Sequence, residues 1–145
     1  MRAVSIPRLG CYRCGWVWRP RLPKARLCPR CKSPYWDVPK VQPVKRGSGL
    51  GIDEILGPHR QEILRLGRRH RVRRIRVFGS VARNEATDAS DVDLLLEFAP
   101  GASSLGRFRF ASELGDLLRR RVDAATDDNL HWLLRPQILA EAVAL

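Results

Sequence analysis

Four cysteines near the start of the chain constrain its fold more than any other feature. They form two Cys-x-x-Cys pairs with 13 residues between them, and the sequence has no others: Cys11, Cys14, Cys28 and Cys31. A Cys-x-x-Cys turn brings two sulfur atoms to one side of a tight loop, so two turns supply the four thiolates that tetrahedral Zn2+ prefers. Because all four ligands come from the protein, we expect one structural zinc ion, with no open position for a substrate.

The cysteines lie in a module that is too short to fold without a ligand. Metal binding should therefore supply most of its folding free energy. Its aromatic residues alternate with arginines, an arrangement that can stack on nucleic-acid bases or form the small core of such a module, and we expect Trp16 and Trp36 to be core. The stretch CPRCKSPYW, residues 28–36, resembles the zinc ribbons of many bacterial and archaeal proteins. We therefore predict a four-cysteine zinc ribbon over residues 1–42.

The positive charge of the chain is concentrated in its N-terminal third. Residues 1–50 hold 12 of the 27 Lys and Arg residues and a single acid, Asp37, whereas the rest of the chain is nearly neutral. A basic module favours an anionic partner, so the ribbon is a candidate nucleic-acid-binding surface or a contact for an acidic protein. The alternative is that the charge only keeps a small module in solution.

Residues 43–51, PVKRGSGLG, separate this module from the rest of the chain. One proline, three glycines and little apolar periodicity are typical of a linker. No apolar stretch approaches the length of a membrane span, and the N-terminus lacks the apolar core of a signal peptide. We therefore expect a cytoplasmic protein with no membrane association.

The remaining part of the chain, residues 52–145, alternates helical and strand patterns. Apolar residues at helical spacing predict helices over 52–67, 104–120 and 136–144. Alternating or continuous apolar runs predict strands over 75–78, 92–98 and 121–126. Together these patterns predict an α/β domain.

A Gly-Ser pair and an Asp-x-Asp motif mark the two ends of the connection between the first two predicted strands. Side chains along a strand alternate between faces, so Asp91 and Asp93 project from the same face. Two carboxylates at one place repel each other unless a cation lies between them, which favours Mg2+. Taken alone, however, acidic residues at a strand end are usually only solvated, and such a motif is a hypothesis.

The stretch FGSVARNEATDASDVDLLLEF, residues 78–98, with RRRVDAAT and LAEAVAL further on, resembles the minimal nucleotidyltransferase family of the polymerase-beta-like superfamily. The resemblance covers residues 52–145, and the ten residues between Gly-Ser and Asp-x-Asp are a specific spacing. It implies a small mixed sheet flanked by helices, Mg2+ and a nucleoside triphosphate substrate, expected to be ATP. Asn84 departs from the pattern, which usually has glycine there, and a zinc ribbon is an addition to it.

The resemblance also implies roles for individual residues. Asp91 and Asp93 would hold two Mg2+ ions, and Asp123, from a neighbouring strand, would be the third metal ligand and a candidate general base. Arg83 would either contact a phosphate or pair with a nearby acid. The residues expected to bind the nucleotide are Gly79, Ser80, Arg83 and Ser90.

The family includes the antitoxins of HEPN/MNT toxin-antitoxin pairs, which transfer AMP to a tyrosine of a HEPN ribonuclease. The resemblance therefore implies a protein adenylyltransferase whose partner is a HEPN-type toxin. The alternatives are a non-catalytic antitoxin, a nucleic-acid-binding adaptor, and transfer to RNA or to a small molecule. Three clustered carboxylates favour an enzyme, because a protein that only binds an anion has no chemical use for them.

Overall fold

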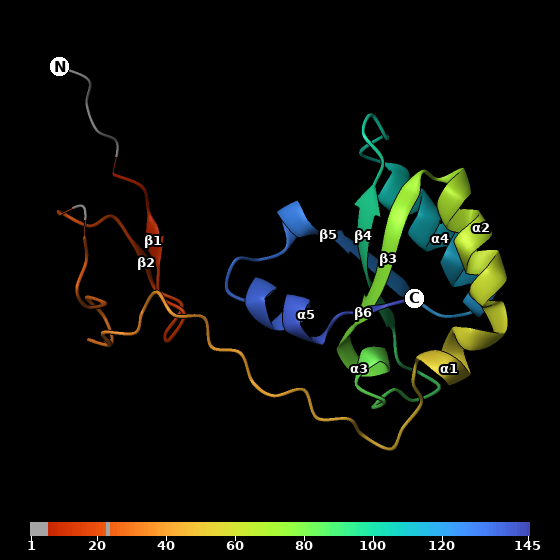
Figure 1. Cartoon of the computed structure of the whole chain (residues 1–145), viewed down its shortest axis with the longest axis horizontal. Helices are drawn as coiled ribbons and strands as arrows, with labels where there is room; N and C mark the ends of the chain where they lie inside the picture. Colours follow the sequence, from red (N-terminus) through yellow and green to blue (C-terminus); the bar gives the residue numbers. More distant parts are fainter. Residues whose placement is uncertain (1–5, 23) are drawn as a thin grey trace.

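The structure is a computed structural model, and it describes residues 6–22 and 24–145. A small N-terminal module is joined by an extended segment to an α/β domain (Figure 1). In the module, β1 (Leu9–Gly10) and β2 (Val17–Trp18) form an antiparallel pair that brackets the first Cys-x-x-Cys turn. The described part of the module has no longer strand and no helix, so its cysteines dominate its structure.

The α/β domain is built on a mixed sheet, as predicted, but with four strands where the sequence predicted three. Its strands are β3 (Val72–Phe78), β4 (Val92–Phe98), β5 (Val122–Thr126) and β6 (Val143–Ala144), in the order β5-β4-β3-β6. Strand β4 runs antiparallel to β3 and parallel to β5, and β6 runs antiparallel to β3. Strand β5 is therefore an edge strand, and the Asp-x-Asp strand β4 is central.

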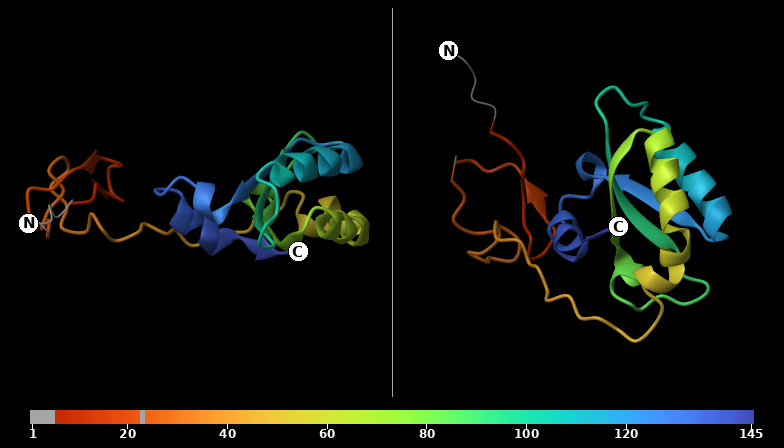
Figure 2. Two further views of the ribbon diagram at one scale, coloured as in Figure 1. Left: turned by 90° about the horizontal axis from the view of Figure 1, so that it is seen from above. Right: turned by 45° about the vertical axis from the view of Figure 1, so that its right-hand side comes forward.

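Helices α2 (Arg60–Arg69) and α4 (Gly106–Leu118) lie together on one face of the sheet (Figure 2). Ile63 of α2 and both Phe110 and Leu114 of α4 are at most 1% exposed, and they pack against the apolar face of β3 and β4. The shorter helices are α1 (Ile52–Ile55), α3 (Gly79–Ala82) and α5 (Arg135–Glu141). Helix α5 lies on the other side of the sheet, toward the N-terminal module (Figures 1 and 2).

The residues of β4 alternate between two faces, and Leu95, which is 1% exposed, shares its face with the aspartates. Val92, Leu94 and Leu96 are at most 2% exposed and belong to the core under α2 and α4. Asp91 and Asp93 project from the other face, where both remain partly accessible. Burial of one face thus fixes the register that presents the acids on the other face.

Two predicted helices differ from the structure. The helix predicted over 52–67 is divided by a 3-10 turn, Gly57–His59, because Pro58 has no N–H and disfavours the helical conformation in the residue before it. The helix predicted over 136–144 ends at Glu141, where Ala142 becomes extended and the chain continues into β6. A strand was not predicted there, since two residues carry too little pattern.

The boundaries of other elements also shift. Strand β3 begins at Val72 instead of 75, and Arg119 ends α4 in a left-handed conformation with φ of 53°.

The two tryptophans expected in the core of the module differ in their environment. Trp36 is partly buried and packs edge-on against Trp18, with ring centroids 5.1 Å apart. The prediction that Trp16 is core is wrong, because Trp16 is 44% exposed and Arg30 stacks over its ring at 5.2 Å.

The end of the predicted linker packs against the α/β domain. The N–H groups of Gly47 and Gly49 donate to the carbonyl oxygens of Arg83 and Asn84, each at 2.7 Å, and Leu50 forms a β-bridge with Ala86. Residues 39–46 before it make no regular secondary structure and are exposed. Among the described residues, no helix combines the length and the apolar character needed to cross a bilayer.

Candidate active site

Three aspartates come together at one end of the sheet. The parallel register of β4 and β5 pairs Asp93 with Asp123, and Asp91 lies two residues before Asp93 on the same face. Their carboxylate oxygens do not converge as tightly as the cysteine sulfurs, since only the cysteines, among the described residues, bring all ligand atoms within 4.8 Å. Asp123 instead lies 3.7 Å from the guanidinium of Arg121.

The electrostatics of Asp93 fit a cation site. Burial raises the pKa of Asp93, and the charges of Asp123 and Asp91 raise it further, while Arg83 acts in the opposite direction. The ionised form of this carboxylate is therefore disfavoured when no cation is nearby. A divalent ion would offset both causes of the raised pKa. It would replace the hydration that Asp93 loses on burial, and it would neutralise the repulsion from Asp123 and Asp91.

Gly79 makes the turn from β3 into α3 directly beside Asp93. Its φ of +73° is a left-handed conformation, and a Cβ atom there would overlap with Oδ2 of Asp93. Only glycine satisfies both conditions. Ser80 follows in the first turn of α3 and remains partly exposed. The predicted Gly-Ser site and the Asp-x-Asp motif are thus adjacent in space.

A residue that the sequence did not single out, Glu141, occupies the inner side of this turn. Its Oε1 accepts the N–H of Gly79 at 3.0 Å, and both carboxylate oxygens accept from Nη1 of Arg83 at 3.2 and 3.1 Å. Arg83 also donates to Glu85 at 3.0 Å. Of the two roles expected for Arg83, the structure contains the ion pair with nearby acids. The only local signal was an acid within the apolar run LAEAVAL.

Ser90 lies in the loop before Asp91, and its hydroxyl accepts the N–H of Thr87 at 2.8 Å. Arg120 donates to the carbonyl oxygens of Thr87 and Ser90 at 2.8 and 3.0 Å. These bonds hold the loop that leads into the Asp-x-Asp strand. Asn84, which replaces the usual glycine, has a left-handed φ of 55°, a conformation that asparagine tolerates better than most residues.

Residues 59–145 match the family model described as nucleotidyltransferase domain. This chain belongs to that family. A Methanocaldococcus jannaschii protein, provisionally named a protein adenylyltransferase, is 40% identical over 94 residues, which are 65% of this chain and 97% of the relative. Protein adenylyltransferase MntA of Thermococcus cleftensis is 38% identical over 92 residues, 63% of this chain and 90% of MntA.

Solved structures agree with this assignment. A structure provisionally described as a minimal nucleotidyltransferase is 43% identical with a TM-score of 0.58, and the match covers 68% of this chain and 100% of that one. A toxin-antitoxin structure with AMP-PNP is 22% identical with a TM-score of 0.50, covering 58% of this chain and 69% of that one, and supports the fold alone. The chain is a nucleotidyltransferase with the minimal fold, and the family match leaves the cysteine module outside.

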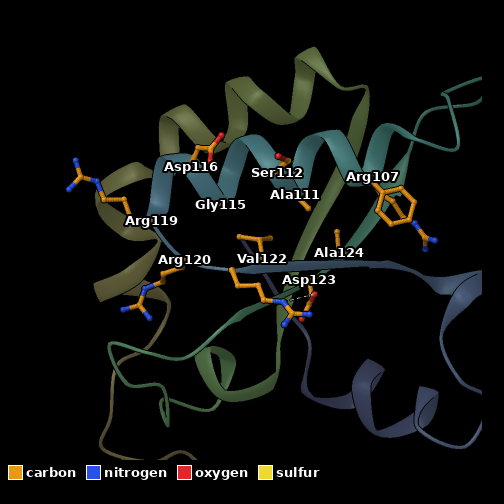
Figure 3. Close-up of a pocket in the computed structure, with 12 residues that line it drawn as sticks. Arg107, Ala111, Ser112, Gly115, Asp116, Arg119, Arg120, Val122, Asp123 and Ala124 are labelled. Atoms are coloured by element: carbon orange, nitrogen blue, oxygen red, sulfur yellow. Dashed lines mark ion pairs between the residues drawn. The ribbon is translucent and has the colours of Figure 1, made fainter.

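The nucleotidyltransferase domain has a groove of about 650 Å³ beside Asp123. It runs between α4 and the edge strand β5, over the small residues Ala111, Gly115 and Ala124 (Figure 3). Asp123, paired with Arg121, borders the groove from the side of β5 away from α4, and Arg107 lies toward one end (Figure 3). Val122 and Ala124 point from β5 toward α4, whereas the carboxylate of Asp123 points to the other side of the strand (Figure 3).

The cysteine cluster has the geometry of a tetrahedral metal site. Two of its six Sγ–Sγ distances, from Cys11 to Cys31 and from Cys14 to Cys28, are 3.7 Å and match the roughly 3.8 Å expected around zinc with bonds of about 2.3 Å. Both Cys-x-x-Cys turns have the same form. Each ends in a left-handed residue, Gly15 with φ of 75° or Lys32 with φ of 61°.

Hydrogen bonds and burial shift the pKa of two of the four thiols in opposite directions. A backbone hydrogen bond involving Trp16 lowers the pKa of Cys14, but burial and the three other thiols raise it to about 11. Burial raises the pKa of Cys28, whereas hydrogen bonds from backbone groups lower it to about 7. Four thiolates within 4.8 Å of one another would repel unless a cation lay among them, so the cysteines fit zinc.

The cysteine module contacts the nucleotidyltransferase domain at the turn before α5. Tyr12 packs edge-on against Trp132 with ring centroids 5.3 Å apart, and a Cβ atom on Gly10 would lie 2.5 Å from the same ring. Gln42 and Gln137 of α5 exchange two hydrogen bonds, at 2.7 and 3.3 Å. The helix that carries Glu141 is therefore also the helix that contacts the module.

Proposed function

We propose that this nucleotidyltransferase transfers AMP from ATP to a tyrosine hydroxyl of a HEPN-type toxin and so acts as its antitoxin. The observation that carries the proposal is the register that brings Asp91, Asp93 and Asp123 to one end of the sheet beside Gly79 and Ser80. The similarity to protein adenylyltransferases, MntA among them, supports a protein acceptor. The AMP-PNP in the toxin-antitoxin neighbour supports an ATP substrate.

In this proposal, Asp91 and Asp93 hold two Mg2+ ions with Asp123. When bound, the ions neutralise charge on the triphosphate and on the attacking and leaving oxygens. Ser80 and the Gly79 turn lie where the phosphates would approach. The acceptor oxygen forms a bond to the α-phosphorus, the bond from that phosphorus to the bridging oxygen breaks, and pyrophosphate leaves. Asp123 receives the hydroxyl proton.

The free edge of β5 is the proposed entry for the acceptor. No strand pairs with β5 on the side opposite β4, so a hydroxyl can approach Asp123 from there. The chain's own tyrosines, Tyr12 and Tyr35, both belong to the cysteine module, and Tyr12 is packed against Trp132. We therefore expect transfer to a partner and not to this chain.

We also propose that the four cysteines hold one structural zinc ion in the cytoplasm, where reducing conditions keep thiols free for a metal.

Mass spectrometry tests the proposal directly. After incubation with ATP, Mg2+ and the cognate HEPN protein, the partner should gain the mass of AMP on a tyrosine. Asp93→Asn removes one charge without a change of shape, and transfer should fall by roughly a thousandfold or more because metal positioning is lost. Asp88→Asn, an exposed acid in the loop before the motif, is the matched control. If the protein neutralises the toxin without ATP, and Asp93→Asn neutralises it equally well, the protein is instead a non-catalytic antitoxin.

A second candidate function is nucleic-acid binding by the module. The exposed Trp16 ring with Arg30 stacked over it is the observation that favours it, because aromatic and guanidinium planes both stack on bases. Single-stranded RNA should bind with an affinity that falls steeply with salt, and Trp16→Ala should weaken it about tenfold. Binding that Trp16→Ala leaves unchanged would reject this function.

A further inference from the structure

Glu141 is the one buried charged side chain in the described part of the chain. The residue is 8% exposed and ends α5, 62 positions after the Gly79 turn. Burying a carboxylate is costly unless its oxygens are bonded to donors or to a cation. A buried acid beside a nucleotide site, which must attract a polyanion, therefore needs a reason.

Its partners supply that reason. Oε1 of Glu141 accepts the backbone N–H of Gly79 at 3.0 Å, and Arg83 contributes the compensating charge through Nη1. The N–H of Gly79 is part of the left-handed turn, whose Cα lies so close to Asp93 that a side chain would overlap with its carboxylate. Glu141 thus bonds to the Gly79 turn, and the Gly79 turn lies directly against Asp93.

We propose that Glu141 is a positioning residue for nucleotide binding, which holds the Gly79 turn against Asp93 through the Gly79 N–H. Arg83 then acts through Glu141, as its internal counter-ion, and not as a ligand of the phosphates. The inference rests on the proposed function only in taking the Gly79–Ser80 turn as part of the nucleotide site.

The arrangement explains why an acid is used here. A neutral acceptor would hold the Gly79 N–H but leave the partly buried Arg83 without its closest buried partner. The pKa of Arg83 is raised by its hydrogen bond to Glu85 and also by Glu141. Glu85 is the exposed member of this pair of acids, with 46% of its side chain accessible against 7% for Glu141. Only Glu141 reaches the turn.

The test measures binding of ATP with a methylene group between the α- and β-phosphorus atoms, so that no transfer occurs. In the full chain with Mg2+, Glu141→Ala should weaken binding about tenfold or more. Glu141→Gln should restore most of the affinity, because its amide oxygen still accepts the Gly79 N–H. Glu85→Gln, the matched control, removes a charge from Arg83 without touching Gly79 and should stay within about twofold of wild type.

The double variant separates the two roles of Arg83. If Arg83 acts only through Glu141, Arg83→Ala combined with Glu141→Ala should bind no more weakly than Glu141→Ala alone. A further tenfold loss would show that Arg83 contacts phosphate directly and would overturn that part of the proposal. All variants are measured at a temperature at which circular dichroism shows them folded.

Two outcomes would overturn the role of Glu141 itself. Tighter binding by Glu141→Ala would mean that this acid competes with the phosphates for Gly79. A lowered melting temperature with unchanged affinity of the folded protein would mean a purely structural role. Absence of nucleotide binding by the wild type would count against the proposed function as well, whereas binding without transfer to a HEPN partner would reject only the acceptor.

Discussion

The cysteine module and the nucleotidyltransferase domain are stabilised in different ways. In the described residues of the module, the only buried apolar side chains are Cys11 and Cys28, while Trp16 and Tyr35 are 44% and 63% exposed. The domain instead buries Ile63, Phe110 and Leu114 between two helices and a sheet. We therefore expect the module to depend on a bound metal ion for its fold, and the domain to depend on burial of apolar surface. The two should therefore fail separately.

Removal of zinc should have the largest effect. Structural zinc contributes about 10–16 kcal/mol in apparent binding free energy to small Cys-rich modules. Chelation should unfold residues 8–38 and leave the domain folded, because exposed linker residues separate them. Amide hydrogen exchange resolved along the chain checks this, with elemental analysis expected to give one zinc per chain. Loss of protection in β3 and β4 at the same chelator concentration would show one cooperative unit.

Leu114→Ala should have the reverse effect: it should destabilise the nucleotidyltransferase domain and leave the cysteine module folded. This side chain of α4 is completely buried in the core of the domain, and its truncation should cost about 2–5 kcal/mol through lost burial and a cavity. Denaturant unfolding followed through the domain should shift, while the zinc content stays at one ion per chain. Leu105→Ala, at a position that is 54% exposed just before the same helix, should change stability by less than about 0.5 kcal/mol. Zinc loss in Leu114→Ala would contradict the separation.

The acids should make the stability of the metal-free domain depend on pH. The pKa of Asp93 is raised in the folded protein, first by burial and then by Asp123 and Asp91, so folding favours its protonated form. Stability should therefore fall as pH rises from the ordinary aspartate pKa through the raised one. Asp93→Asn should melt roughly 2–4 °C higher than wild type above that window and equally below it.

Added Mg2+ supplies the control for this prediction. The ion binds the ionised carboxylate, so it should raise the melting temperature of wild type above the same window and leave Asp93→Asn nearly unchanged. Equal pH profiles for the two proteins without metal would mean that Asp93 is an ordinary solvated acid.

Loss of the contact between the cysteine module and the nucleotidyltransferase domain should have the smallest effect. Trp132→Ala removes the ring that packs against Tyr12 and Gly10, but it lies outside the cysteine cluster and the aspartates. We expect zinc content and domain stability to stay within error and AMP transfer to fall by less than about threefold. Limited proteolysis in residues 39–46 should become faster. Trp16→Ala, which removes an exposed ring of the module, is the control.

The sequence was most informative where a local pattern determined the geometry. The spacing of the cysteines predicted a cluster, and the alternation in β4 predicted that Asp91 and Asp93 share a face. The pairing of Asp93 with Asp123 required a parallel neighbour, which only the family resemblance implied. The exposure of Trp16 was missed because aromatic content does not show how little volume a module of this size can enclose.

Glu141 could not be found in the same way. Its partners lie 58 and 62 positions earlier in the chain, and the apolar run around it extended the predicted helix past its end. Local periodicity gives no information about contacts between such distant segments. The β6 pairing that ends α5 is likewise set by the free edge of β3 and not by its own two residues.

Helix α5 touches both regions at positions one helical turn apart. Gln137 shares hydrogen bonds with Gln42, and Glu141 accepts the N–H of Gly79. Any coupling through this helix must be reciprocal: a factor by which zinc strengthens ATP binding is the factor by which ATP strengthens zinc binding. A chelator competing for the metal would then act more weakly on the nucleotide-loaded protein. The zinc affinity of the module would thus report how much of the nucleotide site, in another part of the chain, is occupied.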